Sequence, residues 1–230
     1  MIAVAIGCYA NALHAQDDTN DQHYVLSSRE TTKASFNLSL GPSITMLPQP
    51  LTEYPTPAPM LDLRWHVPTS QGVHAYGRLG SNFATSIAQA GGMYAHDIGA
   101  FSVGAGYSVA YVYGNIDFVD GFNTTQWRWI NYPMVNVTVK LNELTLTARA
   151  ELELLTSLKQ KIEEQSVNSD LNTFSGAMLT VAAEQPFWND THVLLGVTLS
   201  YSSNPYQSWF IYNTFNERLF SSELFVGFIL

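Results

Sequence analysis

Ten ionisable side chains stand at polar positions of segments whose residues alternate between polar and apolar. They are Asp62, Arg64, His66, Arg78, Arg128, Arg149, Glu151, Glu153, Glu184 and Glu223. Charges held in a narrow, low-dielectric interior are costly unless opposite signs are paired. We therefore expect Arg64 to bind Asp62 or Glu223, and the other three arginines to bind Glu151 and Glu153. The set fits a lumen that filters small solutes or protons, but an internal salt-bridge network that fills the lumen is the favoured interpretation.

Histidines could make such a set catalytic, because proteases and lipid hydrolases use a histidine near a carboxylate or a serine. His66, His74, His96 and His192 all fall at the turn-side ends of the expected strands. No pair of them has the His-x-x-x-His spacing of a metal site, and the sequence has no glycine-rich phosphate loop. We therefore predict no catalytic residue, no metal and no cofactor. A hydrolase of lipid or peptide is the alternative function.

Composition excludes several classes of protein. The chain has 230 residues, the size of one β domain, with 13% charged and 13% aromatic residues. No apolar run approaches the roughly 18 residues of a spanning helix, so a helical membrane protein is excluded. The net charge of -9 and the four lysines (Lys33, Lys140, Lys159 and Lys161) argue against nucleic acid as a partner. Cys8 is the only cysteine, which rules out an internal disulfide.

The charged residues must be positioned by strands, and residues 143–154 show the pattern most clearly. Every second residue from Leu144 to Leu154 is apolar, and every residue between is polar or charged. This alternation predicts one long strand with two unlike faces, of a length that crosses a bilayer at a tilt. The same reading predicts strands at 35–46, 60–67, 73–82, 86–95, 101–113, 125–140, 173–185, 191–202 and 218–230, ten in all.

The connections between these strands alternate between short and long, as in outer-membrane barrels. A proline-rich loop is expected at 47–59, further long loops at 114–124, 156–172 and 203–216, and tight turns elsewhere. The third of these loops is the most polar, and the last contains Tyr206, Trp209, Phe210 and Tyr212, which could bind a surface partner or rest at the lipid interface. An even number of strands brings both chain ends to the periplasmic side.

Alternation alone does not decide whether the apolar face meets lipid or a protein core. The polar face is mostly Ser, Gly, Thr and Asn, which suits the inside of a narrow ring better than the surface of a soluble barrel. Aromatic residues on the apolar face lie toward strand ends, where a membrane girdle would need them: Tyr111, Tyr113, Trp127, Trp129 and Tyr201. These observations favour a closed antiparallel up-and-down transmembrane β-barrel. A soluble lipocalin-like ligand-binding barrel is the alternative fold.

The chain resembles the small bacterial outer-membrane β-barrels over residues 35–230, both in its alternating strands and in its ending, residues 224–230. That ending resembles the C-terminal strand signal that the barrel-assembly machinery reads in this family, although Leu230 replaces the usual Phe or Tyr. The resemblance implies the outer membrane of a Gram-negative bacterium. It also implies membrane lipid, lipopolysaccharide and the assembly machinery as partners, and a structural, surface-binding or small-solute pore function.

The N-terminal residues are expected to lie outside the barrel. Residues 1–15 resemble the apolar part of a secretory signal, without its basic start, and Cys8 also follows a lipobox-like sequence. A hydrophobic N-terminal strand of the mature fold is a further interpretation of this stretch. Residues 16–34 are polar and predict a loose periplasmic leader.

Overall fold

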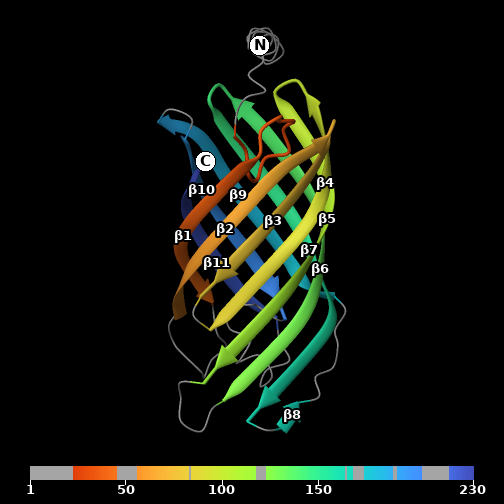
Figure 1. Ribbon diagram of the computed structural model, residues 1–230, viewed down its shortest axis with the longest axis vertical. Coiled ribbons are helices and arrows are strands. Elements are labelled where there is room, and N and C mark those ends of the chain that lie inside the picture. Colours follow the sequence, from red (N-terminus) through yellow and green to blue (C-terminus); the bar gives the residue numbers. More distant parts are fainter. Residues whose placement is uncertain are drawn as a thin grey trace, which may run out of the picture.

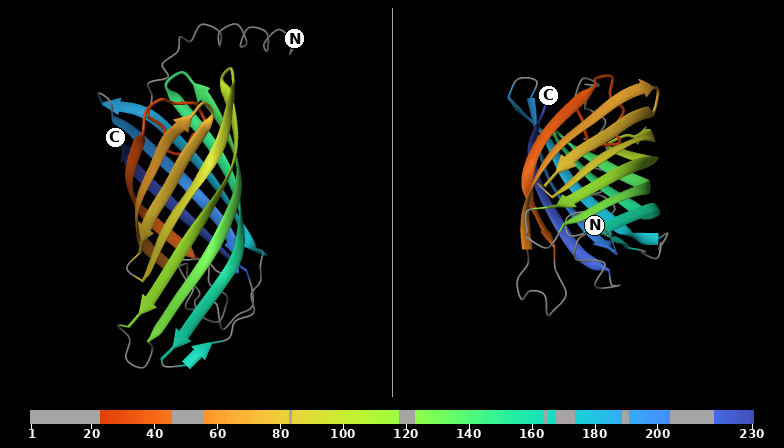
Figure 2. Two further views of the ribbon diagram at one scale, coloured as in Figure 1. Left: turned by 45° about the vertical axis from the view of Figure 1, so that its right-hand side comes forward. Right: turned by 60° about the horizontal axis from the view of Figure 1, so that its bottom comes forward.

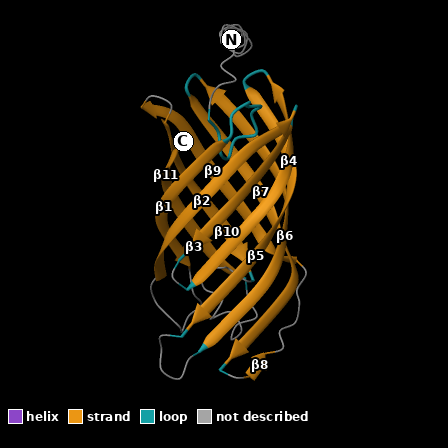
Figure 3. Cartoon of the chain, viewed as in Figure 1, coloured by secondary structure: helices purple, strands orange, loops and turns teal. Residues whose placement is uncertain are grey.

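The computed structural model describes residues 23–45, 56–82, 84–117, 123–163, 165–167, 174–188, 191–203 and 218–230. In these ranges it is built from strands (Figure 3), and no helix there is long and apolar enough to cross a membrane. The strands are β1 (Ser35–Thr45), β2 (Thr56–Ser70), β3 (Val73–Ser81), β4 (Thr85–Ile98), β5 (Phe101–Ile116), β6 (Thr124–Leu141), β7 (Leu144–Ile162), β8 (Gln165–Val167), β9 (Phe174–Trp188), β10 (Thr191–Ser202) and β11 (Leu219–Ile229).

Ten of these strands form one closed antiparallel barrel (Figure 1). Each strand pairs with the next along the chain, β7 pairs with β9, and β11 returns to β1. The short β8 pairs only with the end of β7. The predicted fold class and its ten strands are confirmed.

The two ends of the barrel differ. Two-residue connections at 71–72, 99–100 and 142–143 lie at the end where the C-terminus also lies (Figure 1), which we call the turn end. Gly72, Gly99 and Asn142 have positive φ there, as tight reversals require. The opposite end, where longer stretches separate β1 from β2 and β5 from β6, is called the loop end. Strands β5, β6 and β7 extend past the other strands at the loop end (Figure 2).

The apolar face points outward around the barrel. On β7, Leu152 is 47% exposed, whereas Thr145 is 1% and Glu151 is 7% exposed. Leu61 and Leu195 are also exposed, and Val197 is half-buried on the same outer face. A water-soluble barrel would show the reverse arrangement, so the lipocalin-like alternative is wrong.

One departure from the predicted strands is the length of β7, which continues to Ile162 through part of the expected 156–172 loop. A bulge lies where Ile130 pairs with Leu155 and Trp129 pairs with Ser157, so that Thr156 is the extra residue. Up to Leu155 the odd-numbered residues of β7 face the lumen, whereas after Thr156 the even-numbered Leu158 and Gln160 face inward and Lys159 and Lys161 are exposed. Because the two-residue period is broken at Thr156, the alternation in the sequence predicted a strand that ends at Leu154.

A second departure is β2, which begins at Thr56 inside the expected proline-rich loop. Pro57 and Pro59 pair with Ile44 and Pro42 of β1. Among the described residues, β3 pairs with β2 only from Leu61 onward, so residues 56–60 have a paired strand on one side there. Prolines are tolerated on such an edge.

The outward face provides a direct test of lipid contact. Val135 is 58% exposed near the middle of β6, between Ala105 and Ala150 of the neighbouring strands. Val135→Arg is expected to lower the free energy of unfolding by about 2–4 kcal/mol, because a charged side chain at mid-bilayer depth is poorly solvated. Guanidinium titration in lipid vesicles measures this. The control Gln185→Arg, on exposed Gln185 near the turn end, should cost about 0–1 kcal/mol; equal costs would show that lipid does not cover Val135.

Candidate functional site: the lumen

The centre of the lumen holds a cluster of two arginines and two carboxylates from β2, β3 and β11, which we call the ion cluster. Arg78 binds Asp62 through Nε and Oδ1 at 2.7 Å, and it binds Glu223 through Nη2 and Oε1 at 2.8 Å. Arg64 Nη2 lies 3.1 Å from Asp62 Oδ2 and 3.5 Å from Glu223 Oε1. Its guanidinium also stacks over the Phe225 ring at 4.1 Å. The cluster is balanced in charge and ties strands together across β1.

This geometry agrees with the expected partners of Arg64 but not with those of Arg78. Arg78 was expected to bind Glu151 or Glu153, which are farther along the ring of strands. It binds Asp62 and Glu223 because β2 is its direct neighbour, and Arg64 pairs with Arg78 in the β2–β3 register. Asp62, two residues from Arg64, projects from the same face of β2 and is therefore within reach of both arginines.

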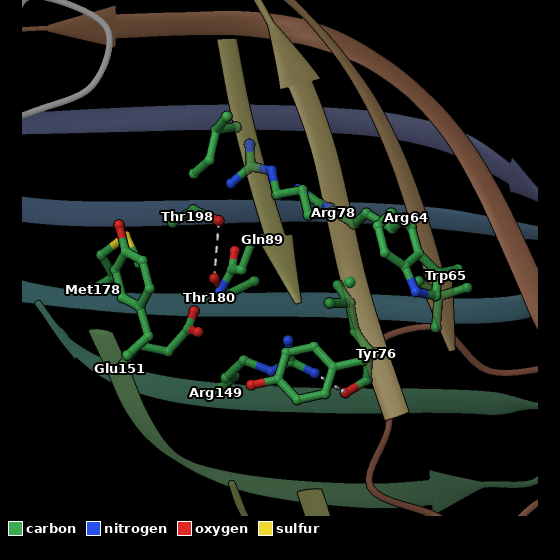
Figure 4. A pocket seen from close by; sticks show the side chains of 15 residues that line it. Arg64, Trp65, Tyr76, Arg78, Gln89, Arg149, Glu151, Met178, Thr180 and Thr198 are labelled. Atoms are coloured by element: carbon green, nitrogen blue, oxygen red, sulfur yellow. Dashed lines mark hydrogen bonds between the residues drawn. The ribbon is translucent and has the colours of Figure 1, made fainter. Parts of the chain in front are cut away.

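The remaining charged residues lie on the other side of the lumen. Arg149 donates from Nη2 to the Leu26 carbonyl at 3.1 Å, and its guanidinium lies 5.3 Å from the Tyr76 ring. Glu153 accepts a hydrogen bond from the Ser202 hydroxyl. Arg128 and Glu151 are buried among them. Figure 4 shows Arg64, Arg78, Arg149 and Glu151 around a common cavity of ≈ 50 Å³, which is room for only a few water molecules.

Residues 23–34 fold into the lumen from the turn end (Figure 1), and we call them the N-terminal segment. One carboxylate, Glu184, accepts three consecutive backbone N–H groups, from Val25 at 2.7 Å, Leu26 at 3.1 Å and Ser27 at 3.1 Å. The predicted leader is therefore not wholly outside the barrel, because its described part lies within the ring of strands.

Further contacts hold the N-terminal segment on several sides. Its carbonyl groups accept hydrogen bonds from Asn136 at 2.8 Å and from Ser102 at 2.5 Å. At the rim, Arg29 donates to the carbonyls of residues 99 and 100 and lies 3.5 Å from Asp97. Val25 and Leu26 join an apolar cluster with Ala182, Leu194, Phe225 and Ile229.

The side chain of Tyr24 in the same segment is also buried, and this burial raises the pKa of its phenol.

Four histidines form two separate ring pairs toward the turn end, and His96, which is exposed, belongs to neither pair. The rings of His66 and His74 lie 4.8 Å apart, and His66 Nδ1 is 3.0 Å from the carbonyl of Tyr24. His192 faces His23 of the N-terminal segment, with ring centroids 5.9 Å apart. His66 and His74 are fully buried. Among the described residues, no group of three or more His, Cys, Asp or Glu side chains is placed to hold a metal ion.

Toward the loop end the lumen is lined by both apolar and polar side chains, since Gln126, Arg128 and Gln160 are buried there. Ile87, Ala110, Val112, Ile130, Tyr132 and Leu155 form one buried cluster. These side chains take up part of the narrow lumen and leave less room for water. Within the described residues the lumen thus contains this apolar cluster with its buried polar neighbours, the ion cluster and the N-terminal segment.

The five aromatic residues predicted for a girdle all lie on the outer face toward the loop end. Tyr111 packs against Trp129 at 5.0 Å between ring centroids, and Tyr113 packs against Trp127 at 6.1 Å. Tyr201 is exposed near the end of β10. The predicted signal at residues 1–15 and the first part of the predicted leader, residues 16–22, lie outside the described residues. Tyr206, Trp209, Phe210 and Tyr212 also lie outside them.

No protein-family model matches the sequence, and no curated protein matches it. Among solved structures, Neisserial surface protein A is similar over 86% of this chain and 96% of its own, with 9% identity and a TM-score of 0.40. The translocator domain of the autotransporter NalP from Neisseria meningitidis covers 99% of this chain and 96% of its own, with 11% identity and a TM-score of 0.41. The KdgM porin covers 83% of this chain and 97% of its own, with 10% identity and a TM-score of 0.37.

The structures in this comparison are barrels of bacterial outer membranes, but TM-scores below 0.5 carry no inference about function. A closed ring of ten antiparallel strands with an apolar outer face and a filled lumen makes the chain a transmembrane β-barrel.

Proposed function

We propose that the protein resides in a bacterial outer membrane as a closed, non-conducting barrel with a structural or surface-binding function. The turn end faces the periplasm and the loop end faces outward, since outer-membrane barrels place their short turns inside. The even number of strands and the location of the C-terminus at the turn end support this orientation.

The observation that carries the proposal is the filling of the lumen. A ten-stranded ring encloses little more than side chains, and here the N-terminal segment occupies part of that space through hydrogen bonds to Glu184, Asn136 and Ser102. The cavity beside the ion cluster measures only ≈ 50 Å³. Function is therefore assigned to the outer face and the loop end rather than to solute passage.

Conductance in planar bilayers tests this proposal. The wild-type protein should produce no stepwise current, and it should not swell liposomes loaded with small sugars. Steady, ohmic steps from protein that remains folded would contradict a closed lumen and would favour a small-solute pore. An empty-bilayer control with the same detergent excludes leakage from the additive.

The C-terminal strand supports assembly into this membrane. On β11, Leu224, Val226 and Phe228 point outward, as does Leu230 directly after it, whereas Phe225 and Ile229 are buried in the lumen. This pattern gives the strand an apolar outward face and supports its resemblance to the C-terminal signal that the barrel-assembly machinery reads in the family that the chain resembles. We include that machinery among the proposed partners.

A hydrolase receives no support from the histidines. His66 and His74 lie beneath the N-terminal segment, and the backbone of Tyr24 covers His66. A general base must reach its substrate within hydrogen-bond distance, which these rings cannot do for a substrate at the cell surface. The proposed function is therefore structural or surface-binding.

A further inference from the structure

A distinct surface lies on the outer face of β5, β6 and β7, near the loop end. Tyr111, Trp127, Trp129, Ser157, Lys159 and Lys161 surround a hollow of ≈ 520 Å³, which we call the lysine patch. Lys159 pairs with Trp127 across the β6–β7 ladder, and Ser157 pairs with Trp129. The side chains of such cross-strand pairs are in contact distance. The patch is therefore a fixed arrangement of two cations beside three aromatic rings.

The charge of this patch is unusual for the chain. It holds two of the four lysines in a protein whose net charge is -9. Both lysines are exposed, and within the described part of the chain neither has an ion-pair or hydrogen-bond partner. They follow the outward residues Leu152 and Leu154 of β7 on the side of the loop end, with Thr156 and Ser157 between. In the proposed orientation this position is where a bilayer changes from hydrocarbon to headgroups. A cation at that level is suited to a phosphate group.

A second, apolar hollow lies beside the patch and shares Tyr111 with it. Leu61, Leu63, Leu79, Ala88, Tyr111 and Tyr113 are among the residues that line this space of ≈ 450 Å³. The hollow forms where the outward side chains of β3 and β4 are small, at Ser81, Ser86 and Ala88. A hollow with this lining accepts an acyl chain, and its neighbour accepts a charged headgroup.

We propose that the lysine patch and the apolar hollow together bind one phosphorylated glycolipid of the outer leaflet, lipid A being its membrane-embedded part. The phosphates lie between Lys159 and Lys161, the sugar rests on Trp127 and Trp129, and an acyl chain occupies the apolar hollow past Tyr111. This site rests on the proposed orientation, because the loop end must face the leaflet that contains the glycolipid.

Binding to the purified barrel in detergent micelles, counted by native mass spectrometry, tests the site. The probes are lipid A with both phosphates, the same glycolipid without phosphate, and phosphatidylglycerol. Lys159→Gln/Lys161→Gln should weaken binding of phosphorylated lipid A by about tenfold or more. The matched control, Lys33→Gln/Lys140→Gln, removes the same charge elsewhere and should change the affinity less than twofold.

A third variant separates the two hollows. Ala88→Trp fills the apolar hollow without changing charge, and it should weaken binding of every acylated probe while leaving the preference for phosphate intact. Equal losses in both lysine double variants, or no preference for phosphate, would overturn the site. Equal affinity for phosphatidylglycerol would overturn the choice of a glycolipid.

The orientation is tested separately, so that the two failures can be distinguished. Labelling of Lys159 and Lys161 with a membrane-impermeant amine reagent on whole cells should occur from outside. If the purified barrel binds lipid A but the lysines are labelled only after the outer membrane is permeabilised, the orientation is wrong, and with it the glycolipid as the natural ligand. If surface labelling succeeds without lipid A binding, the site is wrong and the orientation stands.

Discussion

Replacing Glu184 with alanine should release the N-terminal segment from the lumen. The carboxylate accepts hydrogen bonds from the backbone N–H groups of Val25, Leu26 and Ser27. Without the carboxylate, these N–H groups can bind water only if the segment leaves the barrel. Hydrogen bonds to a charged acceptor contribute about 1.5–3 kcal/mol each. Losing all three hydrogen bonds should raise the equilibrium ratio of released to bound N-terminal segment by roughly a hundredfold or more.

Thiol labelling at the turn end measures this release. Leu194 is fully buried in the apolar cluster that contains Val25 and Leu26, so Leu194→Cys reports on their removal. In a Cys8→Ser background, a water-soluble thiol reagent should label Leu194→Cys slowly in the parent and much faster with Glu184→Ala. Deletion of residues 23–34 sets the upper limit of the labelling rate.

The control for this experiment is Glu143→Ala, which removes a carboxylate from an exposed turn residue. It should leave the labelling rate unchanged. Rapid labelling in the parent protein, equal to that of the deletion variant, would mean that the N-terminal segment does not close the turn end. The proposal of a non-conducting barrel would then lose its main support.

The strands and their outward faces could be predicted because both are local properties of the sequence. Residues 143–154 specify a two-residue period, and a one-residue slip would turn Leu144 and Leu146 into the crowded lumen. The same information ends at Thr156, because a bulge changes the face of every residue after it without changing residue types. Lys159 and Lys161 were accordingly placed in a loop rather than on the lipid-facing side of β7.

The position of the N-terminal segment could not be predicted, because it depends on contacts far apart in the sequence. Val25 and Glu184 are 159 residues apart, and no pattern within either segment links them. Two signals were present in the sequence. Val25 and Leu26 form an apolar pair inside a polar stretch, and Glu184 is a lumen carboxylate for which the expected pairs provided no cation. A buried carboxylate without a cation requires other donors.

Replacing Arg78 with methionine should strongly destabilise the barrel. Arg78 binds both carboxylates of the ion cluster, at 2.7 Å for Asp62 and 2.8 Å for Glu223, and without it Arg64 alone must balance two buried negative charges. Removing one partner from a buried ion pair costs about 3–5 kcal/mol, because the remaining charge is left uncompensated. The free energy of unfolding in lipid vesicles, from guanidinium titration, measures the loss.

Two further variants show whether charge balance is the cause. Arg78→Met/Glu223→Gln restores neutrality and should recover part of the stability, which appears as a coupling energy in a double-mutant cycle. Arg29→Met removes the same kind of side chain from the partly exposed rim, where Arg29 pairs with Asp97 and donates to the carbonyls of residues 99 and 100, and it should cost about 1 kcal/mol. If Arg78→Met is no worse than Arg29→Met, or the double variant is as unstable as the two single losses added together, the ion cluster fills space without holding β3 to β11. Closure of the barrel there would then rest on the backbone ladders through β1 and β2 alone.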